Sequence, residues 1–148
     1  MATFISKSPE ETAQLGEAWG RAAQRGWLFA LSGDLGAGKT QLVKGIARGL
    51  GLSGRVQSPT FALVNEHHGG RLALYHLDLY RLETPAQIIG AGLEAYLEPD
   101  GVSVIEWAER WFDAEPAAKL SPHVHLRRVR ITSLGETERR IDYEDSGA

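Results

Sequence analysis

The chain has 148 residues, of which 43% are hydrophobic and 24% charged, a composition that predicts one globular domain over residues 1–148. Its net charge of −3 argues against tight autonomous binding of DNA or RNA, and the absence of cysteine excludes disulfides, thiolate metal sites and cysteine nucleophiles. The sequence shows neither a signal-peptide pattern nor an apolar run of membrane-spanning length, so we expect a cytoplasmic protein with no membrane partner.

The first segment predicts a short strand, a helix and a second strand. The first strand is expected over 3–6. Ser8, Pro9 and Glu11 then predict a helix start, because serine caps the first N–H groups, proline suits the first helical position and glutamate completes a capping box. Gly26 is expected to end this helix, and the apolar run 27–31 follows as a buried strand.

The most specific motif lies directly after that strand. Residues 33–40 match the G-x-x-x-x-G-K-[ST] pattern of phosphate-binding loops (P-loops), and 41–50 predict the helix that follows. A glycine-rich turn that enters a helix N-terminus binds phosphate through free backbone N–H groups and the helix dipole. Lys39 is expected to contact the β- and γ-phosphates, and the Thr40 hydroxyl to bind Mg²⁺. The predicted nucleotide-binding residues are Gly33, Asp34, Leu35, Gly36, Ala37, Gly38, Lys39, Thr40 and Gln41.

The rest of the chain predicts further strands and short helices. Strands over 61–67 and 71–77 form a hairpin through the turn 68–70, short helices begin at Thr84 and cover 93–97, and a buried strand covers 102–105. The runs 124–132 and 138–144, which carry five arginines, predict a terminal antiparallel hairpin followed by frayed residues. Together these elements predict an α/β fold, a single-domain P-loop nucleotidase sandwich with a mixed β-sheet flanked by helices.

Two acidic residues end predicted strands. Asp78 and Glu106 lie where open α/β sheets bind ligands, beyond the carboxyl ends of the strands, so both can reach a magnesium ion beside Thr40. The alternative for each is a surface carboxylate or a helix cap. Trp107 could equally pack in the core, contact a partner or stack on the nucleotide. For His76, the sequence favours a structural role over that of a proton shuttle.

A further hydroxyl lies in the loop Ser58-Pro59-Thr60. Such a loop closes on the γ-phosphate and Mg²⁺ in other nucleotidases, although the local pattern alone favours an ordinary turn.

In order and spacing, these motifs resemble the bacterial TsaE (YjeE) family, the ATPase of threonylcarbamoyladenosine (t6A) synthesis in tRNA. The resemblance covers nearly the whole chain and rests on residues 33–40, on Ser58-Pro59-Thr60-Phe61, on 76–82 (His-Leu-Asp-Leu-Tyr-Arg-Leu), and on Ile105-Glu106-Trp107. It implies slow, partner-dependent, Mg²⁺-dependent ATP hydrolysis. It also implies action with the TsaB and TsaD proteins on adenosine 37 of tRNAs that read codons beginning with adenine. TsaD would make the transfer, and tRNA would be reached through the complex.

The resemblance also implies roles for individual residues. Lys39 would stabilise phosphate charge, Thr40 and Glu106 would bind Mg²⁺, and Asp78 would be the acid needed for hydrolysis. Thr60 would lie near the γ-phosphate and Trp107 near the nucleotide. The region of Ser8 would face the adenine, and Arg139 or Arg140 would approach the nucleotide.

Three alternatives stay open on the sequence. A small-molecule or nucleoside kinase fits the P-loop, although no lid domain is evident. A nucleotide-dependent binding module would use ATP without useful hydrolysis. A GTPase is less favoured, because the sequence contains no N-K-x-D motif to recognise guanine.

Overall fold

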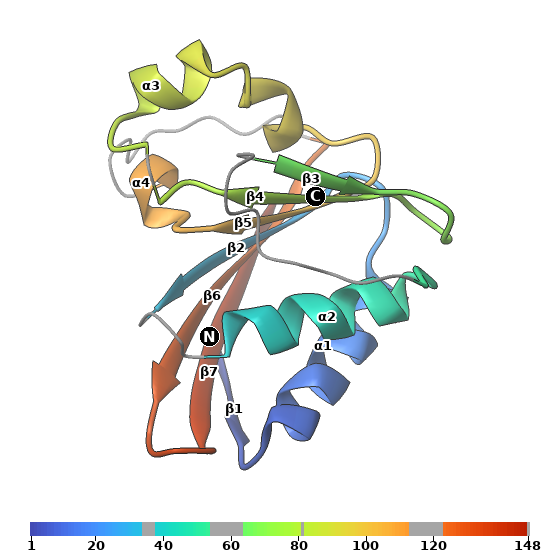
Figure 1. Ribbon diagram of the computed structural model, residues 1–148, viewed down its shortest axis with the longest axis vertical. Coiled ribbons are helices and arrows are strands. Elements are labelled where there is room, and N and C mark those ends of the chain that lie inside the picture. Colours follow the sequence, from blue (N-terminus) through green and yellow to red (C-terminus); the bar gives the residue numbers. More distant parts are fainter. Residues whose placement is uncertain (34–37, 54–63, 81, 113–122, 148) are drawn as a thin grey trace.

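The structure is a computed structural model that describes residues 1–33, 38–53, 64–80, 82–112 and 123–147. These residues form one seven-stranded sheet with helices on both faces (Figure 1). In chain order, the elements are β1 Ala2–Ser6, α1 Pro9–Ala22, β2 Trp27–Gly33, α2 Lys39–Gly49, β3 Val64–His67, β4 Leu74–Asp78, α3 Pro85–Gly90, the 3₁₀ helix η1 Glu94–Leu97, β5 Val102–Glu106, α4 Glu109–Phe112, β6 His125–Ser133 and β7 Arg139–Gly147.

The sheet is mixed, and its strand order is β1-β7-β6-β2-β5-β4-β3. The four central strands β6, β2, β5 and β4 are parallel, whereas β7, β1 and β3 pair antiparallel to their neighbours. The carboxyl ends of the parallel strands therefore share one edge of the sheet. Asp78 and Glu106, the last residues of β4 and β5, are register partners at this edge.

The apolar runs of the central strands are buried on both faces. On β2, Phe29 and Leu31 pack into a core with α1 and α2, whereas Leu28 and Ala30 pack into a second core with α3 and α4. Successive side chains of a strand point to opposite faces, so a continuous apolar run supplies both cores. Figure 1 shows α1 and α2 together on one side of the sheet and α3 and α4 on the other.

Helices α1 and α2 pack in direct backbone contact. A Cβ atom built at Gly45 of α2 would lie 2.1 Å from the carbonyl oxygen of Ala13 in α1, and one built at Gly16 of α1 would lie 2.4 Å from the Leu42 carbonyl oxygen. Gly20 and Gly49 make the same kind of contact one turn further along. Only glycine fits at these positions, so α2 is held against α1 at a fixed distance.

The predicted α/β fold, the strand before and the helix after residues 34–37, the β3–β4 hairpin and the terminal hairpin are confirmed. The end of α1 and the start of β4 differ from the prediction. Helix α1 ends at Ala22 rather than near Gly26, because Ala23 is extended and the Arg71 guanidinium donates to the carbonyl oxygens of Gly20 and Ala23, at 2.7 Å each. Strand β4 begins at Leu74, three residues later than expected from 71–77.

The sequence predicts frayed residues over 145–148, and this prediction is wrong for the described residues 145–147. Strand β7 continues to Gly147 and pairs with β6, and the Arg127 guanidinium donates two hydrogen bonds to the Asp145 carboxylate, at 2.6 and 2.8 Å. A long-range ion pair that the local sequence does not reveal therefore holds the end of the strand. None of the helices in the described ranges has the length and apolar character needed to cross a membrane.

Candidate functional site

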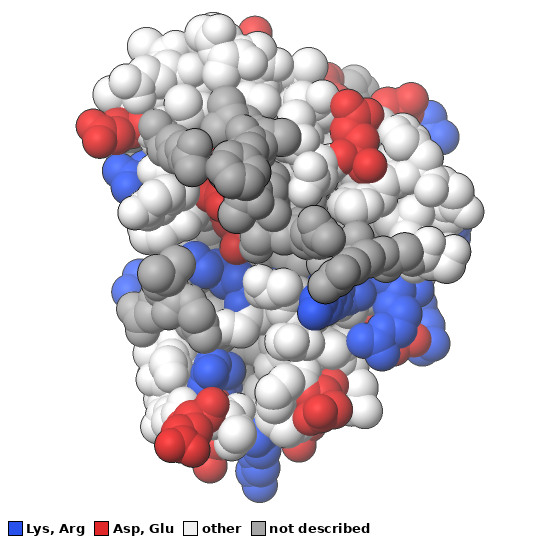
Figure 2. Space-filling model, viewed as in Figure 1, with Lys and Arg blue, Asp and Glu red and all other residues white. Residues whose placement is uncertain are grey.

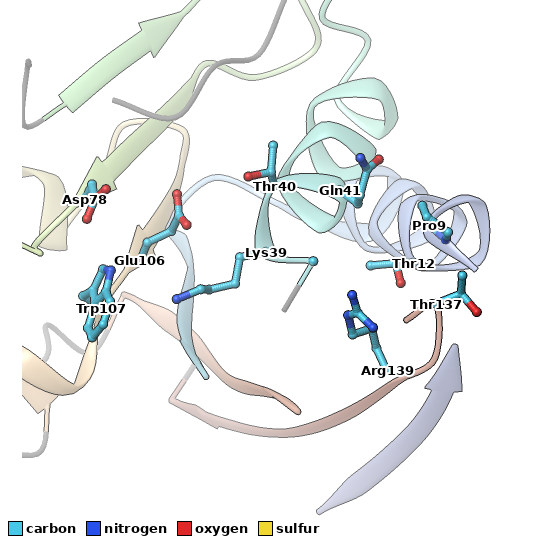
Figure 3. A pocket seen from close by; sticks show the side chains of 11 residues that line it. Pro9, Thr12, Lys39, Thr40, Gln41, Asp78, Glu106, Trp107, Thr137 and Arg139 are labelled. Carbon is cyan, nitrogen blue, oxygen red and sulfur yellow. The ribbon is translucent and has the colours of Figure 1, made fainter. Parts of the chain in front are cut away.

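A pocket of about 510 Å³ lies at the carboxyl edge of the parallel strands, beside the start of α2 (Figure 3). Its volume is within the range of small-ligand sites. The described residues that line it come from α1, α2, the ends of β4 and β5, and the β6–β7 turn: Pro9, Thr12, Gly38, Lys39, Thr40, Gln41, Asp78, Glu106, Trp107, Thr137 and Arg139.

The N-terminus of α2 forms the middle of the pocket. Gly38 is the N-cap residue and has φ +96°, a left-handed conformation that favours glycine. Having no side chain, Gly38 leaves the first backbone N–H groups of the helix uncapped. These donors and the positive end of the helix dipole make this part of the pocket suited to an anion.

Lys39 brings a positive charge to the same place. Its side chain is buried, and its Nζ atom donates to the Gly33 carbonyl oxygen at 3.4 Å and lies 4.8 Å from the centre of the Trp107 ring. A carbonyl oxygen and an aromatic face attract an ammonium group, but neither neutralises its charge. The Asp78 carboxylate attracts the ammonium group electrostatically, and an anion bound at the start of α2 would stabilise the buried charge further.

Two carboxylates form one end of the pocket. Glu106 is only 6% exposed and lies on the same face of the sheet as Asp78, because the two residues are in register on neighbouring parallel strands. Burial raises the pKa of the Asp78 carboxyl group. The hydrogen bond from the Tyr80 N–H opposes this rise, and the negative charge of Glu106 adds to it. A cation between the two carboxylates would relieve both their desolvation and their repulsion.

The oxygen ligands suit magnesium bound together with a phosphate. Among the residues that the structure describes, no group of three or more His, Asp or Glu side chains is arranged to hold a metal ion unaided. The pocket does offer the Thr40 hydroxyl and the Asp78 and Glu106 carboxylates. Mg²⁺ commonly binds through one or two protein oxygens, water and substrate phosphates, so these groups fit that ion in the presence of a nucleotide.

Trp107 occupies the turn directly after β5 and has φ +60°, unusual for a residue other than glycine. Its ring lies beside Lys39 and also contacts the Arg110 guanidinium, 5.5 Å from the ring centre, and the Tyr80 ring, at 5.1 Å between centres. A strained backbone in a pocket wall is typical of functional sites, where neighbouring contacts hold the strain.

The opposite end of the pocket is formed by α1 and the β6–β7 turn. Arg139 lies there with Thr12 and Thr137 (Figure 3), and its Nη1 atom donates to the carbonyl oxygens of Gly135 and Glu138, at 2.8 Å each. Arg140, the other arginine considered from the sequence, pairs with Asp142 and does not line the pocket. The structure thus distinguishes two adjacent arginines that the sequence left equivalent.

Most of the predicted site residues in the described ranges therefore lie together, namely Gly38, Lys39, Thr40, Gln41, Asp78, Glu106 and Trp107. Gly33 does not line the pocket. Its φ is +135°, and a Cβ atom there would lie 2.1 Å from the Ile131 carbonyl oxygen, so glycine is needed for contact between β2 and β6. Asp34, Leu35, Gly36, Ala37 and Thr60 lie outside the described residues.

The sequence did not predict that Thr12 and Thr137 line the pocket, and it did not predict which residue His76 contacts. The buried imidazole of His76 lies 2.6 Å from the Glu106 carboxylate, measured from Nε2 to Oε2. The available signal was its position two residues before Asp78, which places both side chains on one face of β4.

Figure 2 shows acidic and basic side chains facing each other across the middle of this side of the molecule.

Together, the fold and the pocket define a single-domain α/β sandwich with a P-loop sequence between β2 and α2. The family described as "Threonylcarbamoyl adenosine biosynthesis protein TsaE" matches residues 6–141. The chain belongs to this family.

Individual relatives agree with this assignment. The protein named tRNA threonylcarbamoyladenosine biosynthesis protein TsaE of Bacillus subtilis is 37% identical over 140 residues, covering 95% of this chain and 83% of the relative. The protein of the same name from Treponema pallidum is 44% identical over 134 residues, covering 90% and 95%. The crystal structure of Bacillus subtilis YdiB is 31% identical with a TM-score of 0.76, and the match covers 99% of this chain and 86% of that one.

Proposed function

We propose that this chain binds ATP with Mg²⁺, hydrolyses it slowly, and supports formation of t6A at position 37 of tRNAs that read codons beginning with adenine. The observation that carries the proposal is the convergence of Lys39, Thr40, Asp78 and Glu106 around the uncapped start of α2. The names of the relatives support the tRNA pathway. Lysine, a hydroxyl and carboxylates around a helix N-terminus are the groups that nucleotide hydrolysis requires.

In this proposal the nucleotide lies along the pocket with its phosphates over the start of α2. Lys39 would contact the β- and γ-phosphates, and Thr40 and Glu106 would hold Mg²⁺, which would supply positive charge to offset that of the phosphates. Asp78 would be the acidic residue that hydrolysis requires, acting through the attacking water or the metal. Thr60, outside the described residues, would lie near the γ-phosphate. The adenosine extends toward Thr12 and Arg139, at the other end of the pocket.

The chain would act with TsaB and TsaD and would reach tRNA through them. TsaD would transfer the threonylcarbamoyl group, and ATP use by this chain would permit repeated turnovers. The net charge of −3 supports an indirect contact with tRNA, since direct binding relies on many basic contacts to phosphate.

The test is to measure ATP hydrolysis with Mg²⁺ by this chain alone and again with purified TsaB and TsaD, together with t6A formation on tRNA. We expect slow hydrolysis that changes when the pair is added. Lys39→Ala should abolish hydrolysis, whereas Lys44→Ala should leave it unchanged, because Lys44 is an exposed lysine of the same helix outside the pocket.

An unchanged rate with no complex formed would reject the partner assignment. A screen of hydroxylated metabolites for acceptor-dependent ADP release would then test the kinase alternative. Full t6A formation over many turnovers by a variant that binds ATP without hydrolysing it would favour the binding-module alternative.

A further inference from the structure

We infer that His76 is a positioning residue that fixes the orientation of the Glu106 carboxylate for magnesium. The inference rests on the proposed function, because it concerns the same nucleotide site. It assigns a role to a buried histidine outside the pocket lining, one that acts only through its contact with Glu106.

The sheet register brings the two side chains together. Strands β4 and β5 are parallel neighbours in which His76 is paired with Val104 and Asp78 with Glu106. Because side chains alternate along a strand, His76, Asp78 and Glu106 all lie on the face that packs against α2. The His76 ring is fully buried, and its Nε2 atom lies 2.6 Å from Oε2 of Glu106.

The hydrogen bonding indicates which ring nitrogen carries the proton. The Nδ1 atom of His76 is buried and has no hydrogen-bond partner among the residues that the structure describes. A neutral ring protonated at Nε2 donates to the carboxylate and leaves only an acceptor unpaired at Nδ1. Protonation at Nδ1 instead would bury an unpaired N–H donor and would leave Nε2 facing the carboxylate with no proton to share, which is costly.

The contact determines how Glu106 is presented to the pocket. With Oε2 held by the histidine, the side chain cannot rotate freely, and Oε1 remains as the oxygen available to a cation. Figure 3 shows the Glu106 side chain reaching toward Thr40 at the start of α2. Histidine and carboxylate groups that hydrogen-bond to metal ligands commonly contribute about 10- to 100-fold to metal affinity.

The experiment separates positioning from a purely structural role by measuring how strongly magnesium assists nucleotide binding. A non-hydrolysable ATP analogue is titrated by calorimetry, with Mg²⁺ and with EDTA, into the wild type, His76→Leu, His76→Asn and His76→Gln. Leucine removes the donor, asparagine places its amide nearer the Nδ1 position, and glutamine keeps a donor near the Nε2 position. Thermal melting checks that each variant is folded.

We expect Mg²⁺ to strengthen analogue binding about tenfold less in His76→Leu and His76→Asn than in the wild type, with the affinity in EDTA changed by less than about twofold. His76→Gln should retain most of the magnesium effect. In a Glu106→Ala background, His76→Asn should cause no further loss, because the two residues act through one contact.

An undiminished magnesium effect in whichever of His76→Leu and His76→Asn is folded would overturn the inference. So would an equal loss of affinity with Mg²⁺ and with EDTA, which indicates a general structural role. Failure of the wild type to bind the analogue at all would instead overturn the proposed function, so the two failures are distinguishable.

Discussion

Because α1 and α2 are in direct backbone contact, adding one methyl group at Gly45 is predicted to destabilise the fold strongly. Gly45→Ala places a Cβ atom 2.1 Å from the Ala13 carbonyl oxygen and 2.9 Å from the backbone nitrogen of Glu17. Both neighbours are backbone atoms, so no side-chain rotation can relieve the overlap. The helices would have to separate by roughly 1.3 Å at this point to restore an ordinary contact of 3.4 Å.

Two opposing effects determine how much Gly45→Ala changes the free energy of unfolding. Alanine favours a helix interior over glycine by about 1 kcal/mol. Overpacking costs typically about 1–3 kcal/mol, and a rigid backbone clash belongs near the upper value. The expected net loss is therefore about 2 kcal/mol in the free energy of unfolding, which for a chain of this size lowers the melting temperature by about 4–8 °C.

The assay is thermal and urea unfolding followed by circular dichroism, with Gly90→Ala as the matched control. Gly90 ends helix α3, and a Cβ atom there has nothing within 4 Å, so its variant should match or slightly exceed the wild type in stability. A Gly45→Ala protein as stable as Gly90→Ala would refute the reasoning, because it would show that α1 and α2 can separate without cost.

Three further predictions concern charge. Burial raises the pKa of Asp78, so the native state holds this proton more tightly than the unfolded state. Stability therefore falls as pH rises from the ordinary aspartate pKa of 3.8 through the native pKa. Asp78→Asn should therefore melt higher than the wild type at pH 7, with the advantage vanishing below pH 3.8, while ATP hydrolysis is lost; a lower melting temperature at pH 7 would contradict this. The hydrogen bond from the Arg127 guanidinium lowers the pKa of Asp145. The ionised Asp145 therefore stabilises the fold above pH 3.8, and this stabilisation is lost as the pH falls through the native pKa. Asp145→Asn should cost no more than about 1 kcal/mol at pH 7 in urea unfolding, and the difference should shrink in acid. Arg139→Ala should weaken ATP binding about tenfold in calorimetric titrations, in line with the loss of a charged hydrogen bond, and Arg140→Ala should leave it unchanged; equal effects would reject the distinction between the two arginines.

The local sequence was sufficient for the elements that carry their own signals. The apolar run before Gly33 and the helix after Thr40 predicted β2 and α2, and the positions of Asp78 and Glu106 at strand ends predicted that they share an edge of the sheet. These predictions worked because a parallel sheet places its carboxyl ends together whatever the order of its strands.

Features that depend on strand order could not be predicted in this way. The contact between His76 and Glu106 requires β4 to lie beside β5, and the place of Thr137 in the pocket requires β6 to lie beside β2. The helix pattern of α2 likewise gave no sign that Gly45 touches the backbone of α1. Each of these contacts joins segments far apart in the chain, whereas sequence periodicity reports only on neighbours along it.

The pairing of β1 with β7 has a consequence for how the molecule is made. Strand β1 can pair with β7 only after β7 has been synthesised, and β2 likewise waits for β6. Such long-range pairings slow folding. Thr137 and Arg139 join the pocket at this final stage, so a chain that stops before β6 lacks one wall of it. Affinity for nucleotide should thus appear only after β6 and β7 have been synthesised and have joined the sheet.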